Sequence, residues 1–155
     1  MDLESMYQEV ILDHYRSPHG KGELDPFDAE VFHVNPTCGD EVTLRVKLSD
    51  DADPLVEGLG HVGQGCSISQ ASASVLFDQV NGQPLSEAMP IVDEFSMLMY
   101  SATSDVDIAT LDDEKLGDAI AFEGVAKYPA RIKCALLSWM AFREAVETAQ
   151  ASKTN

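Results

Sequence analysis

The sequence predicts an α+β fold in which a three-stranded antiparallel sheet packs against helices. Three segments with strand character follow one another, at 29–34, 42–48 and 55–63. The middle segment alternates apolar and polar residues, which is typical of a strand with one buried face. The connections between the segments are short, and this favours an antiparallel meander.

Helical periodicity precedes and follows these strands. Apolar residues recur three and four positions apart over 3–14, where His14 lies on the apolar side, and we interpret it as a packed, hydrogen-bonded imidazole in preference to a ligand. We expect residues 101–118 to be polar and surface-exposed, and residues 151–155 to fray. Further helices are predicted over 67–80, from Ser86 to about 99, and from Tyr128-Pro129 to about Thr148.

Length and charge limit the classes of function. The 155 residues are enough for one domain, 1–155, with its own core. A net charge of −17 would repel nucleic acid and an anionic membrane surface, whereas it suits a basic protein partner or serves solubility. No apolar run is long enough for a membrane span, and the first residues lack signal-peptide features, so we expect a cytoplasmic protein.

The odd number of cysteines, three, favours metal binding or reactive thiols over disulfides. Cys38 and Asp40 flank Gly39; in an extended segment they would face one point, and Gly39 allows a sharp bend. Cys66 precedes a predicted helix, whose N-terminus favours a thiolate. Cys134 falls in the first turns of the last helix.

We hypothesise that Cys38, Asp40, Cys66 and Cys134 form one tetrahedral zinc site of three thiolates and a carboxylate. The spacing lacks paired Cys-x-x-Cys motifs, and each cysteine taken separately also fits a buried, small apolar residue. Cys38 lies on a loop beside glycine, so it is our candidate for the nucleophile of sulfur chemistry.

Four sequence blocks resemble the SufU family, the zinc-containing branch of the IscU/NifU-like iron–sulfur scaffold proteins. The resemblance covers nearly the whole chain, with the blocks in family order. They are YQEVILDHY at 7–15, NPTCGD at 35–40, GQGCSIS at 63–69 and RIKCA at 131–135.

The resemblance implies zinc held by Cys38, Asp40, Cys66 and Cys134. It also implies a partner, the pyridoxal-phosphate enzyme SufS, a cysteine desulfurase, and delivery of sulfur to downstream iron–sulfur assembly machinery. The residue matching Cys38 leaves the zinc and accepts persulfide sulfur in that family, so the chain is expected to be a zinc-dependent sulfurtransferase. Arg131 matches an arginine beside the site that matters for activity; from the residues alone, it also fits pairing with surface acids.

Two features favour sulfur relay over cluster building. IscU-type scaffolds carry a histidine directly before the last site cysteine, whereas Lys133 occupies that position here. The stretch around 97–118 is typical of SufU and lacking in IscU. Two alternatives stay open: a scaffold that assembles a transient [2Fe–2S] cluster on the same ligands, and a module in which zinc is only structural.

Overall fold

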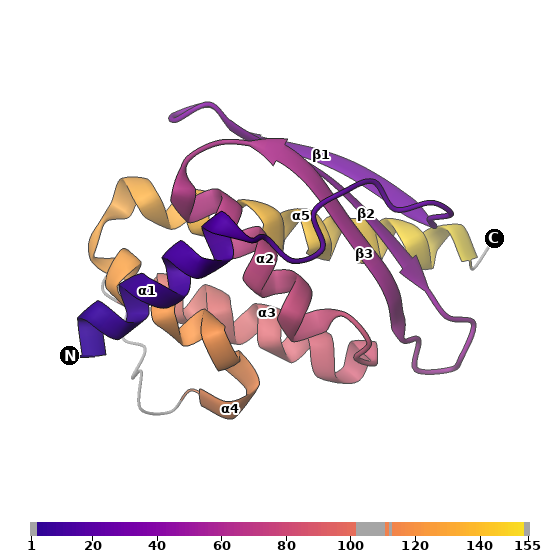
Figure 1. Ribbon diagram of the computed structural model, residues 1–155. Helices are drawn as coiled ribbons and strands as arrows, with labels where there is room; N and C mark the ends of the chain where they lie inside the picture. Colours follow the sequence, from indigo (N-terminus) through magenta and orange to yellow (C-terminus); the bar gives the residue numbers. More distant parts are fainter. Residues whose placement is uncertain (1–2, 102–110, 112, 154–155) are drawn as a thin grey trace.

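The computed structural model describes residues 3–101, 111 and 113–153. Figure 1 shows the sheet lying along one side of the helices. The elements in chain order are α1 (Leu3–Arg16), β1 (Ala29–Asn35), β2 (Asp40–Leu48), β3 (Val56–Gln64), α2 (Ser67–Val80), α3 (Leu85–Met99), α4 (Asp113–Leu116), the 3₁₀ helix η2 (Gly117–Lys127) and α5 (Pro129–Lys153).

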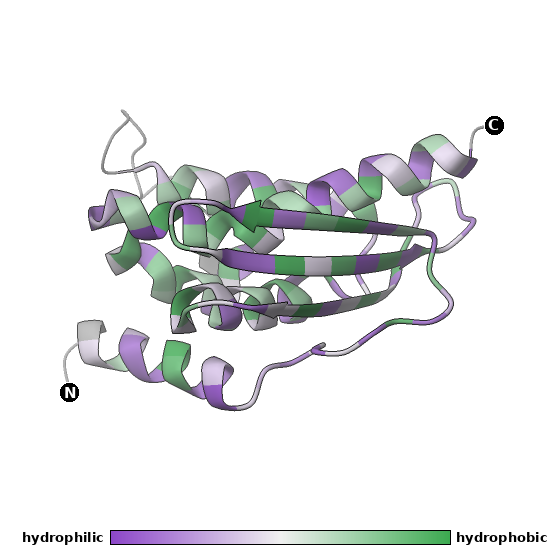
Figure 2. Cartoon of the chain, turned by 90° about the horizontal axis from the view of Figure 1, so that it is seen from above, coloured by the Kyte–Doolittle hydropathy of each residue, from purple (hydrophilic) through white to green (hydrophobic). Residues whose placement is uncertain are grey.

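The sheet confirms the predicted antiparallel meander, in the order β1-β2-β3. Asn35 pairs with Asp40 at the β1–β2 turn, and Glu41 pairs with Gln64 on β3. Every second residue of β2 is buried, beginning at Asp40, and the alternating hydropathy of the strands is visible in Figure 2. The buried face of β2 contacts α5, so inward-pointing β2 side chains meet that helix.

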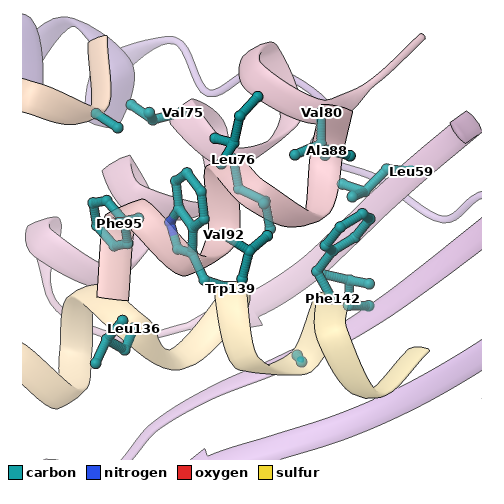
Figure 3. Packing of buried hydrophobic residues seen from close by; sticks show 14 of the residues in the cluster. Leu59, Val75, Leu76, Val80, Ala88, Val92, Phe95, Leu136, Trp139 and Phe142 are labelled. Carbon is teal, nitrogen blue, oxygen red and sulfur yellow. The ribbon is translucent and has the colours of Figure 1, made fainter. Parts of the chain in front are cut away.

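The core lies between the sheet and the helices α2, α3 and α5 (Figure 3). Phe95 of α3 stacks on Trp139 of α5, with ring centroids 4.1 Å apart. The Trp139 indole N–H donates to Ser72 Oγ of α2 at 2.9 Å, and the Ser72 hydroxyl donates to the Ala135 carbonyl at 2.5 Å. This pair of bonds joins α2 to α5 close to the residues that form the site described below.

Helix α1 packs against α2 and η2. His14 is 5% exposed, and its Nδ1 lies 2.7 Å from Ser74 Oγ, which confirms the expectation of a packed and hydrogen-bonded imidazole. Among the helices that the structure describes, none is both long and apolar enough to cross a membrane.

Two sequence expectations about exposed segments are wrong. Residues 102–110 and 112 of the polar stretch lie outside the described residues, but Leu111 and Leu116 are buried in the core and residues 113–116 form α4. The last helix does not fray at 151–153: it extends to Lys153, whose ammonium group donates to the Leu48 carbonyl and to Asp50, each at 2.9 Å. These bonds fasten the helix end to the sheet; residues 154–155 are outside the described part.

Candidate metal centre

Asp40 is the polar end of an apolar stripe. Its side chain is on the same face of β2 as Val42 and Leu44, so strand alternation directs it towards the helices, and it is only 2% exposed. Its Oδ1 accepts a hydrogen bond from the Cys66 backbone N–H at 3.0 Å. A carboxylate in this position needs donors or a cation, because burial of an unpaired charge is costly.

The turn between β1 and β2 places Cys38 beside Asp40. The Cys38 thiol donates to Asp40 Oδ2 at 3.1 Å. The two side chains meet through a turn and not through the extended segment that the sequence analysis assumed, since Gly39 has a φ of 75°. Asn35 holds this turn: its carbonyl accepts from the Gly39 N–H at 2.8 Å, and its Oδ1 accepts from the Thr37 N–H at 3.2 Å.

Cys66 is the N-cap residue of α2, as predicted. Its thiol lies 3.5 Å from Asp40 Oδ2 and is exposed to solvent. Gly65, the preceding residue, is required by packing: a Cβ there would lie 2.4 Å from Asp40 Oδ1 and 2.6 Å from Ser69 Oγ. The Ser69 hydroxyl in turn donates to the Cys66 carbonyl at 3.0 Å, which stabilises the first turn of the helix.

Cys134 reaches the same point from α5. Its sulfur lies 3.2 Å from Cys38 Sγ, and the Asn35 amide donates to it at 3.8 Å. The ligand atoms of Cys38, Asp40 and Cys134 all lie within 4.8 Å of one another. The Cys66 thiol is outside that group of three but touches it through Asp40. The fold therefore brings together three of the expected ligands and places the fourth next to them.

The donor set fits a zinc ion. Zn–S bonds of about 2.3 Å and Zn–O bonds of about 2.1 Å in a tetrahedron separate neighbouring ligand atoms by roughly 3.6–3.8 Å. The separations here are 3.1 Å for Cys38–Asp40, 3.2 Å for Cys38–Cys134 and 3.5 Å for Cys66–Asp40. Side-chain shifts of about half an ångström would bring these atoms to zinc distances.

The protonation states of the cluster depend on burial and hydrogen bonding. Burial raises the pKa of Asp40, but hydrogen bonds from the Cys134 and Cys38 thiols and from the Cys66 N–H outweigh it and leave that pKa below its ordinary value. Burial, followed by hydrogen bonds with Asp40 and Cys38, raises the pKa of Cys134 far above its ordinary value. The shifts of Asp40 and Cys134 thus favour an ionised carboxylate beside a protonated Cys134 thiol, and a divalent cation would favour the Cys134 thiolate.

Arg131 lies one turn before Cys134 on α5, so both residues project from the same side of that helix. The Arg131 guanidinium lies 5.4 Å from the centre of the Tyr128 ring. It also lines a cavity of about 640 Å³ between α1, η2 and the start of α5. Among the described residues, the Arg131 guanidinium contacts this ring and not Asp40 or a cysteine.

Asn35, Gly65 and Ser69 lie in the quoted sequence blocks, but their supporting roles were not predicted. Each positions a ligand or a ligand-bearing turn without being a ligand. Asn35 had one detectable signal, because a polar residue at an inward position of a strand needs a partner. Gly65 lies in the block at 63–69, but the contact that requires it to lack a side chain depends on tertiary structure and cannot be read from that block.

Comparison with known proteins identifies the family. The model of the family described as "NifU-like N terminal domain" matches residues 6–135. The chain belongs to this family. The resemblance noted from the four sequence blocks is therefore confirmed.

The relatives of this NifU-like domain have two kinds of names. The chain is 42% identical over 146 residues to a protein of Bacillus subtilis named zinc-dependent sulfurtransferase SufU. The match covers 94% of this chain and 92% of the relative. The chain is 38% identical over 145 residues to a protein of Streptococcus pyogenes named iron-sulfur cluster assembly scaffold protein IscU, covering 94% and 85%.

A solved structure confirms the fold class. The crystal structure of a candidate iron-sulfur cluster assembly scaffold protein for the SUF system, from Fervidobacterium islandicum, matches with a TM-score of 0.73 and 32% identity. The match covers 93% of this chain and 98% of that one. The α+β architecture with its three-stranded sheet is thus that of the SufU and IscU relatives.

Proposed function

We propose that this protein is a zinc-dependent sulfurtransferase that accepts persulfide sulfur from a SufS-type cysteine desulfurase for iron–sulfur cluster assembly. The observation that carries the proposal is the cluster of Cys38, Asp40 and Cys134, with the Cys66 thiol adjacent and with Cys38 exposed. The Bacillus subtilis relative, named zinc-dependent sulfurtransferase SufU, supports the same activity. Residues 1–155 would carry out this function as one domain.

The residues that would hold zinc are Cys38, Asp40, Cys66 and Cys134, and bound zinc would keep their thiols ionised at neutral pH. Cys38 is the acceptor, because it lies on a turn and is open to solvent. Its thiolate attacks the outer sulfur of the desulfurase persulfide. One S–S bond forms on Cys38, the S–S bond on the desulfurase breaks, and the electron pair leaves with the desulfurase cysteine as a thiolate.

Asp40 is a poor base for ionising Cys38. Its Oδ2 accepts from the protonated Cys38 thiol at 3.1 Å, but a carboxylate with a lowered pKa binds a proton weakly. Bound zinc would therefore be the group that keeps Cys38 ionised. Arg131 supplies a permanent positive charge at the cavity beside α5. We assign it to stabilising the anionic sulfur during transfer, with the Tyr128 ring holding its side chain over the cavity.

The test measures cysteine desulfurase turnover with the zinc-loaded protein and the sulfur bound to it. The wild type should raise turnover, and mass spectrometry should find one additional sulfur on Cys38. Cys38→Ser should lose both effects. Thr37→Ala, in the same exposed turn, is the matched control and should keep both. Full stimulation by Cys38→Ser, or transferred sulfur found only on another cysteine, would contradict the assignment.

A scaffold function is the second candidate, and it is favoured by the Streptococcus pyogenes relative, which is named as an iron-sulfur cluster assembly scaffold protein. Thiolates with one carboxylate also suit a transient [2Fe–2S] cluster. Lys133, exposed beside Cys134, leaves no imidazole at the position where IscU-type scaffolds have one. Anaerobic reconstitution separates the two functions: a stoichiometric, transferable cluster would support the scaffold, whereas a zinc-loaded site that refuses iron would support sulfur transfer.

The proposed partner surface is electrostatic in part. The net charge of −17 suits a basic patch on the desulfurase, and the three cysteines are free, as a reducing cytoplasm would keep them. Affinity between the two proteins should fall as the salt concentration rises. Binding that is equally tight at low and high salt would assign the acidic surface to solubility.

A further inference from the structure

A second cluster of metal-ligating side chains lies outside the thiol site. His14 of α1 and His19 of the following loop approach each other with ring centroids 5.1 Å apart. Asp78 of α2 faces both of them, and ligand atoms of the three residues all lie within 4.8 Å of one another. Asp118, near the start of η2, contacts the same nitrogen of His14 that faces Asp78.

The carboxylates contact the ring nitrogens directly. Both oxygens of Asp78 lie 2.8 Å from His19 Nδ1, and its Oδ2 is 4.0 Å from His14 Nε2. The Asp118 Oδ2 atom lies 2.9 Å from the same His14 nitrogen. The ligand atoms of His14, His19 and Asp78 therefore converge on one small volume, and Asp118 reaches it through the His14 Nε2 atom.

Within the described residues, no lysine or arginine pairs with the carboxylates of this cluster. The ion-pair partners of Asp78 and Asp118 are the imidazoles of His14 and His19. A neutral imidazole offers one N–H, so His14 Nε2 can donate to only one of the two carboxylates that face it. A shared cation would satisfy both carboxylates at once.

Ser74 orients the buried imidazole for this role. Its Oγ accepts from the His19 backbone N–H at 2.8 Å and lies 2.7 Å from His14 Nδ1. When Nδ1 carries the proton and donates to Ser74, the Nε2 lone pair faces the carboxylates. Metal-binding histidines are commonly fixed in this way, with the second ring nitrogen bonded to an oxygen.

We propose that His14, His19 and Asp78, with Asp118 as the fourth ligand, form a second metal site for a divalent transition ion such as Zn²⁺. His14 would then be a metal ligand as well as a packed imidazole, contrary to the interpretation from the sequence. Imidazole nitrogens with carboxylate oxygens suit zinc and its neighbours better than Mg²⁺ or Ca²⁺, which prefer oxygen alone. This site contains no sulfur, so it differs in chemistry from the thiol centre and does not depend on the proposed sulfur transfer.

The ion would join elements that are far apart in sequence. It would fasten the end of α1 and the next loop to α2 and η2, the two elements against which α1 packs. The cavity of about 640 Å³ that Arg131 lines has one wall on α1, formed by residues such as Tyr7 and Ile11. Occupancy of the second site would therefore limit the movement of that wall.

The test uses the full chain with zinc already bound at the thiol centre. Calorimetric titration with Zn²⁺ should show one further saturable equivalent. His19→Ala and Asp78→Asn should weaken this second binding at least tenfold, and His19 is exposed enough for the protein to fold without its ring. His33→Ala is the matched control, because it also removes an imidazole that contacts a carboxylate, that of Glu144. His33 lies outside the cluster, so this variant should leave the second zinc affinity unchanged.

Co²⁺ added to the same zinc-loaded protein distinguishes the two centres. Binding at the second site should give weak visible bands without the sulfur-to-cobalt bands of a thiolate complex. The proposal is overturned if no saturable second equivalent binds, if sulfur-to-cobalt bands accompany it, or if His33→Ala weakens it as much as His19→Ala does. A circular dichroism spectrum like that of the wild type establishes that each variant is folded.

Discussion

Replacement of Gly65 by alanine should weaken zinc binding without touching a ligand. The added Cβ would lie 2.4 Å from Asp40 Oδ1, so the carboxylate must retreat by several tenths of an ångström. The hydrogen bond from the Cys66 N–H to that oxygen, 3.0 Å long, would then be lost. Gly65 is not among the glycines with positive φ, so the contact and not the backbone conformation causes the effect.

The expected magnitude follows from the lost bond. A hydrogen bond to a charged group contributes about 1.5–3 kcal/mol. If Asp40 is a ligand and this bond orients it, zinc affinity should fall by roughly 10- to 150-fold, since about 1.4 kcal/mol corresponds to a factor of ten. Loss of an outer hydrogen bond to a metal ligand typically weakens affinity by about 10- to 100-fold, which agrees.

Competition with a chromophoric chelator would measure this change. Gly124→Ala is the control, because a Cβ at Gly124 meets nothing within 4 Å. A zinc dissociation constant for Gly65→Ala that equals that of the control would refute the reasoning, because it would mean that the position of the Asp40 carboxylate does not matter for the metal.

Three further predictions concern stability and activity. Ser72→Ala leaves the buried Trp139 N–H without its acceptor and should cost about 1–3 kcal/mol in urea unfolding. Burial lowers the pKa of His61 below 6.5, partly offset by its hydrogen bond to the His19 carbonyl, and the charge of Lys21 lowers it further. Below about pH 6.5 the unfolded state therefore takes up a proton on His61 more readily than the folded state. On acidification, the unfolding free energy of the wild type should fall more steeply than that of His61→Gln, by up to about 1.4 kcal/mol per pH unit. Arg131→Ala should reduce desulfurase stimulation severalfold at unchanged zinc content.

Each of these has a clear contrary result. A loss below about 0.5 kcal/mol for Ser72→Ala would mean that water or another group satisfies the indole. Parallel plots of unfolding free energy against pH for the wild type and His61→Gln would show that His61 does not titrate differently on folding. Full stimulation by Arg131→Ala would return that residue to the role of a surface charge.

The three strands could be predicted from the sequence because apolar and polar residues alternate along them. The prediction failed at the strand ends, where polar residues occupy inward positions. The predicted strands stop short of Asn35 and Asp40, yet those two residues pair with each other in the hairpin. An apolar pattern cannot extend through the residues that build a site, because a site needs polar groups on the buried face.

The segment after α3 shows a different limit. Ala119 and Phe122 of η2 are fully buried, but 3₁₀ geometry repeats every three residues and gives no amphipathic pattern of period 3.6. The ordered end of α5 at Lys153 could not be predicted either. Its bonds to Leu48 and Asp50 join residues more than a hundred positions apart, and a local sequence pattern does not reveal such contacts. The candidate ligands were identified by residue type and family blocks, whereas their convergence required the tertiary fold.

The spread of the candidate ligands along the chain affects when the centre can be completed during synthesis. Cys38 and Cys134 are 96 residues apart, while Asp40 and Cys66 are separated by 26. At roughly 5–20 residues per second, a ribosome makes Cys134 several seconds or more after Cys66. A nascent chain would hold an incomplete set of donors during that interval. Ribosome-bound chains halted before α5 should therefore lose zinc to a chelator that the folded protein resists, and equal retention would show that Cys134 is dispensable.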